Sequence, residues 1–179
     1  AIQATGNGHI SRAVQLYPHL QKFGEVDFFL SGNYASLKVD LPIKFKSNGC
    51  SLHYSKCGGL SYWGIAKNIK PIQIFKDAKA LPLKNYDVVV NDFDAVTSLA
   101  CKLQKVNSVQ FGHQASFISD LTPRPEKRSF LGENILKHYA TSPQSIGLHF
   151  ESYDSFILPP IIKDEIIQAN PKNLNHITV

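Results

Sequence analysis

The stretch AIQATGNGHISRA, residues 1–13, contains residues that could bind a ligand or take part in catalysis. A short apolar run is followed by Gly6, Asn7, Gly8 and His9, and helical spacing of apolar residues then begins. Backbone N–H groups at the start of a helix attract anions, and glycine lets a ligand approach the backbone closely. An imidazole at this place could also accept a proton from a hydroxyl group. The pattern predicts a ligand-binding turn with a candidate general base.

Two later strands are also predicted to end in polar residues. The valine-rich run at 88–90 is followed by Asn91 and Asp92, and a later strand runs into His113 and Gln114. Ligands of parallel α/β sheets bind beyond the carboxyl ends of the strands. We therefore expect these side chains and His9 to gather in one crevice, where they could bind a substrate.

The roles of these residues stay open from sequence alone. His9 is either a base, favoured by a helix dipole that disfavours a charged ring, or a residue of the turn. Asp92 could orient an imidazole, bind hydroxyl groups, be the base itself, or cap the next helix, which Asp94 could do equally well. His113 and Gln114 could hydrogen-bond a ligand or face solvent.

Several basic and polar residues are weaker candidates. Ser11 and Arg12 could meet a phosphate near the turn, although Arg12 could equally be an exposed helix charge. The loop at 115–129 carries Arg124, Lys127 and Arg128, for which a solvated charge run is the better interpretation. Long ordered loops of this kind often cover or bind ligands.

The glycine turn departs from a dinucleotide-binding fingerprint. Gly6 and Gly8 fit the first two positions of G-x-G-x-x-G, but Ser11 stands at the third. The second strand ends in Ser-Gly-Asn at 31–33 without the acid that would hold a ribose, and Asp27 comes too early. We expect neither NAD nor FAD as a cofactor.

No metal site is expected. Cys50, His53 and Cys57 lie close together in the sequence but supply only three ligands, and no second cluster completes the site. The chain has 3 cysteines, an odd count without a C-x-x-C pair, which favours a reducing compartment.

Composition is that of an ordinary globular domain. The 179 residues are 43% hydrophobic and 18% charged, and no apolar run approaches the roughly 18 residues of a membrane span. The net charge of +5 allows attraction to phosphate or anionic lipid without demonstrating it. We expect no nucleic-acid partner.

The periodicity predicts an alternation of strands and helices. This order predicts an α/β fold, a Rossmann-like parallel sheet of about six or seven strands with helices on both faces. The valine run should be covered on both faces. Residues 1–168 would form this domain, and 169–179 a linker and the first strand of a second domain. Predicted strands are 1–4, 25–31, 42–47, 50–55 (a hairpin with 42–47), 86–93, 106–113 and 145–150, and predicted helices are 9–22, interrupted by Pro18, 60–80, broken by Pro71, 94–105, 132–139 and 159–169.

Four stretches resemble one enzyme family: AIQATGNGHISRA, VVVNDFDAVTSLACK, FGHQASF and HFESYDSFILPPI. The G-x-G-H turn before an apolar helix resembles the start of GT-B glycosyltransferases. It is similar to the branch that contains the peptidoglycan N-acetylglucosamine transferase and the UDP-glucuronosyltransferases, and the four stretches in order resemble bacterial glycosyltransferases of this type. The resemblance covers nearly the whole chain, as the amino-terminal half of a GT-B fold only.

This resemblance implies the acceptor-binding half of an inverting, metal-independent glycosyltransferase. A hexose-type sugar would pass from a nucleotide sugar, bound mostly by a carboxyl-terminal half, to an acceptor hydroxyl on a lipid-linked molecule or glycan. No cofactor is implied beyond this UDP-sugar co-substrate, and the expected location is cytoplasmic, with peripheral membrane contact a further expectation. Either His9 or Asp92 would be the base, and the expected substrate-binding residues are Gly6, Asn7, Gly8, Ser11, Arg12, Asn91, His113 and Gln114.

Two other functions stay open. A UDP-sugar epimerase can share the GT-B shape, and a nucleotide- or carbohydrate-binding module would need no catalysis. Because half of the site would lie in the second domain, we expect the 179-residue fragment alone to transfer no sugar.

Overall fold

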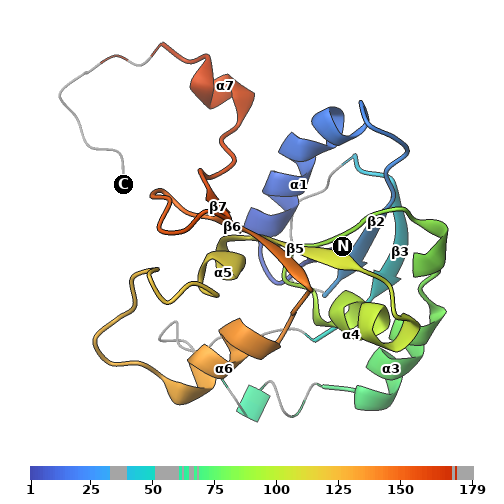
Figure 1. Cartoon of the computed structure of the whole chain (residues 1–179). Helices are drawn as coiled ribbons and strands as arrows, with labels where there is room; N and C mark the ends of the chain where they lie inside the picture. The colour runs from blue at the N-terminus through green and yellow to red at the C-terminus, as the bar shows by residue number, and fades with distance from the viewer. Residues whose placement is uncertain are drawn as a thin grey trace.

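The computed structural model describes residues 1–32, 40–50, 61, 63–64, 67, 69–170 and 172. Within these residues the chain is an α/β protein with two parallel sheets flanked by helices, which confirms the predicted Rossmann-like fold class (Figure 1). One sheet has the order β1 (Ile2–Gln3), β2 (Phe28–Ser31) and β3 (Ile43–Ser47). The other has the order β4 (Val89–Asn91), β5 (Ser108–Gly112), β6 (Gln144–Leu148) and β7 (Ile157–Leu158).

The two sheets meet at β1 and β4. A parallel bridge joins Ile2 to Asp92, and the Gln3 N–H donates to the Asp92 carbonyl at 3.2 Å. The order across both sheets is therefore β3-β2-β1-β4-β5-β6-β7, so the strand order reverses between β1 and β4. In open α/β sheets this reversal point is where ligands bind, outside the carboxyl ends of the strands.

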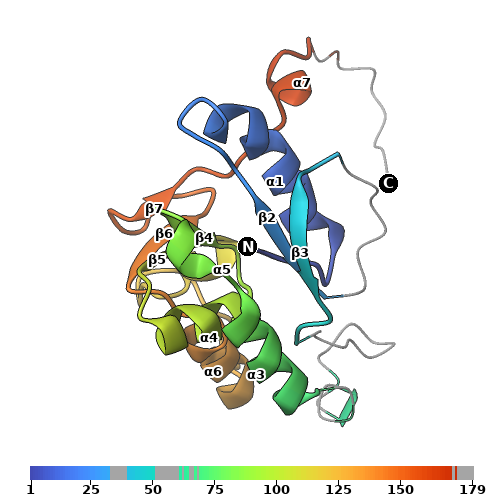
Figure 2. The ribbon, with the colours of Figure 1, turned by 90° about the vertical axis from the view of Figure 1, so that its right-hand side faces the viewer.

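Helices cover both faces of the sheets (Figures 1 and 2). Adjacent residues of a strand point to opposite faces. Accordingly Phe28 packs in one apolar cluster with Ile10 of α1, whereas Phe29 packs in another with Ala78 of α3 and Val96 of α4. The helices are α1 (Asn7–Leu20), α3 (Pro71–Ala80), α4 (Ala95–Gln104), α5 (His113–Ser116), α6 (Phe130–His138) and α7 (Asp164–Ile167), with a 3-10 turn η1 (Leu83–Asn85).

The start of α1 differs from the prediction by two residues. The helix begins at Asn7 rather than His9, so Gly8 and His9 lie in its first turn. Pro18 lies near the end of the helix, which stops at Leu20. α3 begins at Pro71 instead of being broken by it, as expected for a residue whose missing N–H costs nothing at the first helical position.

The predicted carboxyl-terminal helix at 159–169 is wrong in extent, because α7 has only four residues, Asp164–Ile167. Proline disfavours helical backbone in the residue before it, so Pro159 and Pro160 keep the chain extended. The apolar periodicity that suggested a longer helix has no core to pack on, since Ile162 is 47% exposed and Ile166 63%. The short β7 was not predicted, and Pro159 follows its last residue.

The valine run is covered on one face only. Val89 is buried with the α3 and α4 cluster, whereas Val90 is 39% exposed. The apolar cluster beneath α1 contains no β4 residue among the described ones, so the expectation of two covered faces is wrong for this strand.

Some predictions lie outside the described residues. These are most of the strand at 50–55, much of the helix at 60–70, the strand at 176–179, His53 and Cys57. Among the helices that the structure describes, none is long and apolar enough to cross a bilayer.

Candidate functional site

The glycine turn leaves space beside the start of α1. Gly6 is the extended N-cap residue, at φ −163°, and has no side chain with which to cap the helix. The first turn holds no acidic residue, so the positive end of the helix dipole is not offset there. Beyond its own helix and chain neighbours, a Cβ atom added to Gly6 or Gly8 would meet no described atom within 4 Å. The space beside both glycines is therefore open to a ligand.

His9 and Asp92 form a hydrogen-bonded pair at the reversal point of the sheet. The His9 Nδ1 and Asp92 Oδ1 atoms are 2.8 Å apart, and the side chains are 14% and 8% exposed. An ionised carboxylate only accepts hydrogen bonds, so a hydrogen bond at this contact requires a proton on Nδ1. In the neutral ring Nε2 then carries the lone pair, which is the form a general base requires.

Arg12 is the third member of this cluster. It lies one helical turn after His9, and its Nε donates to Asp92 Oδ2 at 3.0 Å while its Nη2 donates to Oδ1 at 2.7 Å. Nη2 is also 3.0 Å from His9 Nδ1. A guanidinium cannot accept a hydrogen bond, so Nδ1 cannot both carry the proton for Asp92 and accept one from Arg12. The tautomer of His9 therefore depends on which of the two contacts is the hydrogen bond.

Asp94, rather than Asp92, caps helix α4. The Asp94 carboxylate accepts the Thr97 N–H at 2.7 Å and that of Val96 at 3.4 Å, which makes it the N-cap of α4. Asn91 is fully buried, and its amide donates to the Asp94 carbonyl and accepts the Asp94 N–H. Both amide atoms of Asn91 thus hold the turn that presents Asp92, instead of facing a ligand as expected from the sequence.

Gly112 is a positioning residue that the sequence analysis did not single out. Its φ of +130° suits glycine, and a Cβ atom there would lie 2.7 Å from Asp92 Oδ1 and 3.1 Å from Arg12 Nη2. The end of β5 can approach the ion pair only because this residue has no side chain. A glycine directly before His113 at a strand end was the available signal.

His113 and Gln114 begin α5 beyond Gly112. The Nδ1–H of His113 donates to the Leu148 carbonyl at 3.1 Å, and its ring stacks on His149 with centroids 5.5 Å apart. Since a carbonyl only accepts, this bond leaves Nε2 of His113 free of the backbone. Gln114 Oε1 is buried without a hydrogen-bond partner in the described structure.

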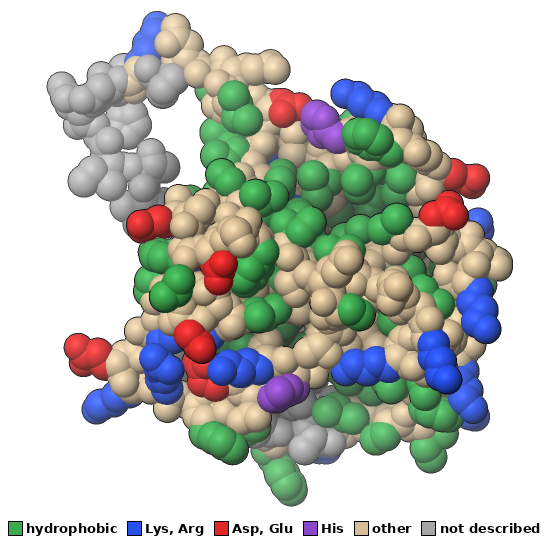
Figure 3. All heavy atoms as spheres, in the orientation of Figure 1, with side chains coloured by type: hydrophobic (Ala, Val, Ile, Leu, Met, Phe, Trp, Pro, Cys, Tyr) green, Lys and Arg blue, Asp and Glu red, His purple; other side chains and the backbone are tan. Residues whose placement is uncertain are grey.

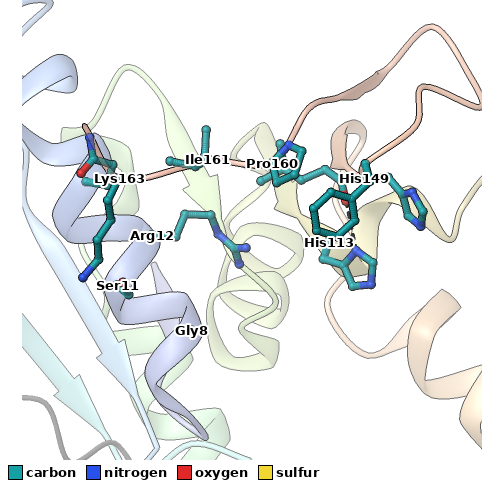
Figure 4. A pocket seen from close by; sticks show the side chains of 11 residues that line it. Gly8, Ser11, Arg12, His113, His149, Pro160, Ile161 and Lys163 are labelled. Atoms are coloured by element: carbon teal, nitrogen blue, oxygen red, sulfur yellow. Dashed lines mark hydrogen bonds between the residues drawn. The ribbon is translucent and has the colours of Figure 1, made fainter. Parts of the chain in front are cut away.

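A pocket of about 370 Å³ opens at this edge of the sheet (Figure 4). One wall is α1, through Gly8, Ser11 and Arg12, and His113 belongs to the lining as well. The remainder comes from Gln15 of α1, from residues 148–150 at the end of β6 and just after it, and from 160, 161 and 163. His9 and Asp92 do not line the pocket and are connected to it through Arg12.

The sequence analysis missed the second part of this lining. His149 and Phe150 were included in the predicted strand at 145–150, but β6 ends at Leu148, so they follow a strand end like the other site residues. Lys163 was placed inside a predicted helix, yet it lies in the extended segment before α7. The signal for His149 and Phe150 was a strand end followed by an imidazole and an aromatic ring, whereas nothing in the local sequence marked Lys163.

The carboxylates of Asp92 and Asp94 already have hydrogen-bond partners within the protein. Asp92 and Asp94 have a D-x-D spacing, and two such carboxylates can hold a divalent cation. Here Asp94 caps α4 and Asp92 pairs with Arg12 and His9. The described residues contain no group of three metal-ligating side chains, and Cys50, whose pKa burial raises to about 11, keeps its thiol proton at neutral pH.

The loop composition suggested that Arg124 is a solvated charge, but the structure buries its side chain. Its side chain is 5% exposed, lies over the Phe117 ring at 4.6 Å and donates to the Phe117 carbonyl at 2.5 Å. It fixes the fold of its own loop, whereas Lys127 and Arg128 remain exposed.

Comparison of the chain with protein families, curated proteins and solved structures found no match.

Proposed function

We propose that this chain is the acceptor-binding half of an inverting, metal-independent GT-B glycosyltransferase, acting on an acceptor hydroxyl with a nucleotide-sugar donor. The observation that carries the proposal is the 2.8 Å contact between His9 and Asp92 at the strand-reversal point. The reaction class comes from the resemblance of the four sequence stretches. Asp92 fits the orienting role because Asp94 already caps α4.

In the proposed reaction Asp92 holds the Nδ1–H of His9, so Nε2 takes the proton of the acceptor hydroxyl. The hydroxyl oxygen attacks the anomeric carbon of the donor, and the bond from that carbon to the nucleoside diphosphate breaks. A single displacement inverts the anomeric centre. The proton leaves the His9 imidazole positively charged, and the Asp92 carboxylate stabilises that charge.

The contacts of Arg12 favour a second candidate function, in which the chain is a module that binds an anionic ligand without catalysis. Arg12 contacts both carboxylate oxygens of Asp92 and approaches His9, and a neighbouring cation opposes a positive charge on the ring. In such a module the cluster would only present Arg12 to the ligand. Wild-type protein containing both halves that binds UDP-sugars but never transfers or hydrolyses them would favour this candidate.

The test of the transferase is the His9→Asn variant of the protein that contains both halves. Asparagine can donate to Asp92 but cannot accept a proton at neutral pH. Loss of a general base costs about 100- to 10,000-fold in rate, so turnover should fall by that factor while donor affinity holds. His19→Asn is the matched control, because His19 lies on the same helix with 53% of its side chain exposed. Near wild-type turnover of His9→Asn, with chemistry rate-limiting, would show that His9 is not the base.

A further inference from the structure

The pocket beside α1 is lined by positively charged and imidazole side chains. Arg12 and Lys163 are its cationic residues, His113 and His149 contribute imidazole rings, and the lining contains no Asp or Glu. The volume of about 370 Å³ is near the lower end of the range for small-molecule sites. The lining therefore favours a small anionic ligand over a neutral one.

The overall charge of the chain does not explain this pocket. Lys and Arg side chains gather at the lower right of Figure 3, where Figure 1 has α3 and α4. Lys79 of α3, Lys84 of η1, and Lys102 and Lys105 at the end of α4 are exposed. These residues do not line the pocket. Its charge is a local property, and lysines such as Lys102 provide matched controls for it.

Two of the three guanidinium nitrogens of Arg12 hold the side chain in place. Nε and Nη2 make the hydrogen bonds to Asp92, and Nη1 takes part in none of the hydrogen bonds that the structure describes. Because Asp92 balances the charge of Arg12, this pair alone attracts an anion weakly. The start of α1, whose first turn holds no acidic residue, and Lys163 supply the net positive potential, and Arg12 supplies a fixed donor.

The other side of the pocket suits an organic group. Figure 4 shows His113 and His149 opposite the α1 residues, with Pro160 and Ile161 between the two sides. Phe150 also lines the pocket and is 91% exposed. A ligand with a phosphate at α1 and a ring or chain toward these side chains would use both parts of the lining.

We propose that this pocket binds a phosphate-bearing organic ligand, with Arg12, Lys163 and the start of α1 as its phosphate contacts. The ligand is either the diphosphate of a nucleotide or a phosphorylated sugar. Because this is a binding site, it stands whether or not His9 acts as a base.

The test is calorimetric titration of the 179-residue chain with inorganic pyrophosphate at low salt. Loss of a charge-assisted hydrogen bond weakens binding by about tenfold or more. We expect that loss for Arg12→Gln and for Lys163→Gln, and an unchanged affinity for Lys102→Gln, which removes the same charge from α4. Lys163 is exposed, so its variant keeps the fold even if Arg12→Gln does not.

Ring nitrogen NMR gives a second readout. Arg12 Nη2 is 3.0 Å from His9 Nδ1, so pyrophosphate on Arg12 should shift the His9 ring signals and leave those of His19 unchanged. Absence of pyrophosphate binding, or an equal loss of affinity in Lys102→Gln, would overturn the proposal. Titrations with UDP and with glucose 1-phosphate distinguish the sources: tighter binding of UDP assigns the nucleotide, and tighter binding of glucose 1-phosphate assigns the phosphorylated sugar. Binding is measured without sugar transfer, so failure here leaves the His9 test unaffected.

Discussion

Asp92 accepts hydrogen bonds from an imidazole and a guanidinium at nearly the same distance, 2.8 Å and 2.7 Å at Oδ1. Arg12 Nη2 also lies 3.0 Å from His9 Nδ1, so the two side chains share one carboxylate and contact each other. An anion that drew Arg12 away from Asp92 would therefore change the hydrogen bonds of His9.

At the residue scale, we predict that Gly8→Ala makes the fold more stable and weakens ligand binding. An added methyl group meets no atom within 4 Å, and alanine favours a helix more than glycine does. Gly8→Ala should raise the free energy of unfolding by up to about 1 kcal/mol. Because Gly8 lines the pocket, the same methyl group should weaken pyrophosphate binding.

Urea unfolding and calorimetry check the two effects in the same samples. Gly24→Ala is the control, since its added methyl group also meets nothing within 4 Å and Gly24 is not in the pocket lining. Unchanged affinity in Gly8→Ala would mean that no ligand approaches the backbone at this turn.

At the scale of elements, the cap of α4 carries a second prediction. Asp94→Ala removes the acceptor of the Thr97 and Val96 N–H groups, which typically costs about 1 kcal/mol. Asp94→Asn should retain most of the stability, because asparagine caps helices about as well as aspartate. The free energy of unfolding in urea measures both variants. An unaffected Asp94→Ala would show that the cap contributes little to α4.

The elements were predictable where the pattern matched their packing. The strands at 28–31, 43–47 and 108–112 and helix α4 lie inside their predicted ranges, because alternating or helical apolar positions there meet a core. β7 has two residues, too few for any period to register. The predicted helix at 159–169 failed because periodicity indicates an apolar side but cannot supply the surface that buries it.

The site was predictable only in part for a related reason. His9, Asp92 and His113 stand next to glycines or strand ends, where sequence position itself indicates an exposed edge. The pairing of Arg12 with Asp92, 80 residues apart, depends on β1 lying beside β4, and nothing in the local sequence of either residue specifies that neighbour. The same holds for Lys163, which reaches the pocket from the far end of the described chain.

At the scale of the molecule, the edge opposite the site carries a pH-dependent cluster. Asp27, just before β2, accepts hydrogen bonds from Lys44 at 2.8 Å and from the Tyr86 hydroxyl at 2.6 Å. These two bonds, that of Lys44 first, lower the pKa of Asp27, and burial, followed by the bond to Asp27, raises the pKa of Tyr86 to about 12.

A carboxylate whose pKa is lower in the folded state stabilises the fold above its unfolded pKa, near 4. That contribution is lost as the pH falls through the lowered value. The free energy of unfolding should therefore fall between pH 5 and pH 3 more steeply in the wild type than in Asp27→Asn, with Asp87→Asn as the control. Equal slopes in all three proteins would contradict the assignment. Pyrophosphate affinity should be unchanged in Asp27→Asn, since Asp27 is not part of the pocket lining.

The bridge between β1 and β4 also makes the site depend on the contact between the two sheets. His9 and Asp92 are 83 residues apart in the chain, and each follows a strand of a different sheet. The pairing of β1 with β2 and of β4 with β5 does not bring these two residues together. The ion pair therefore exists only where β1 lies beside β4.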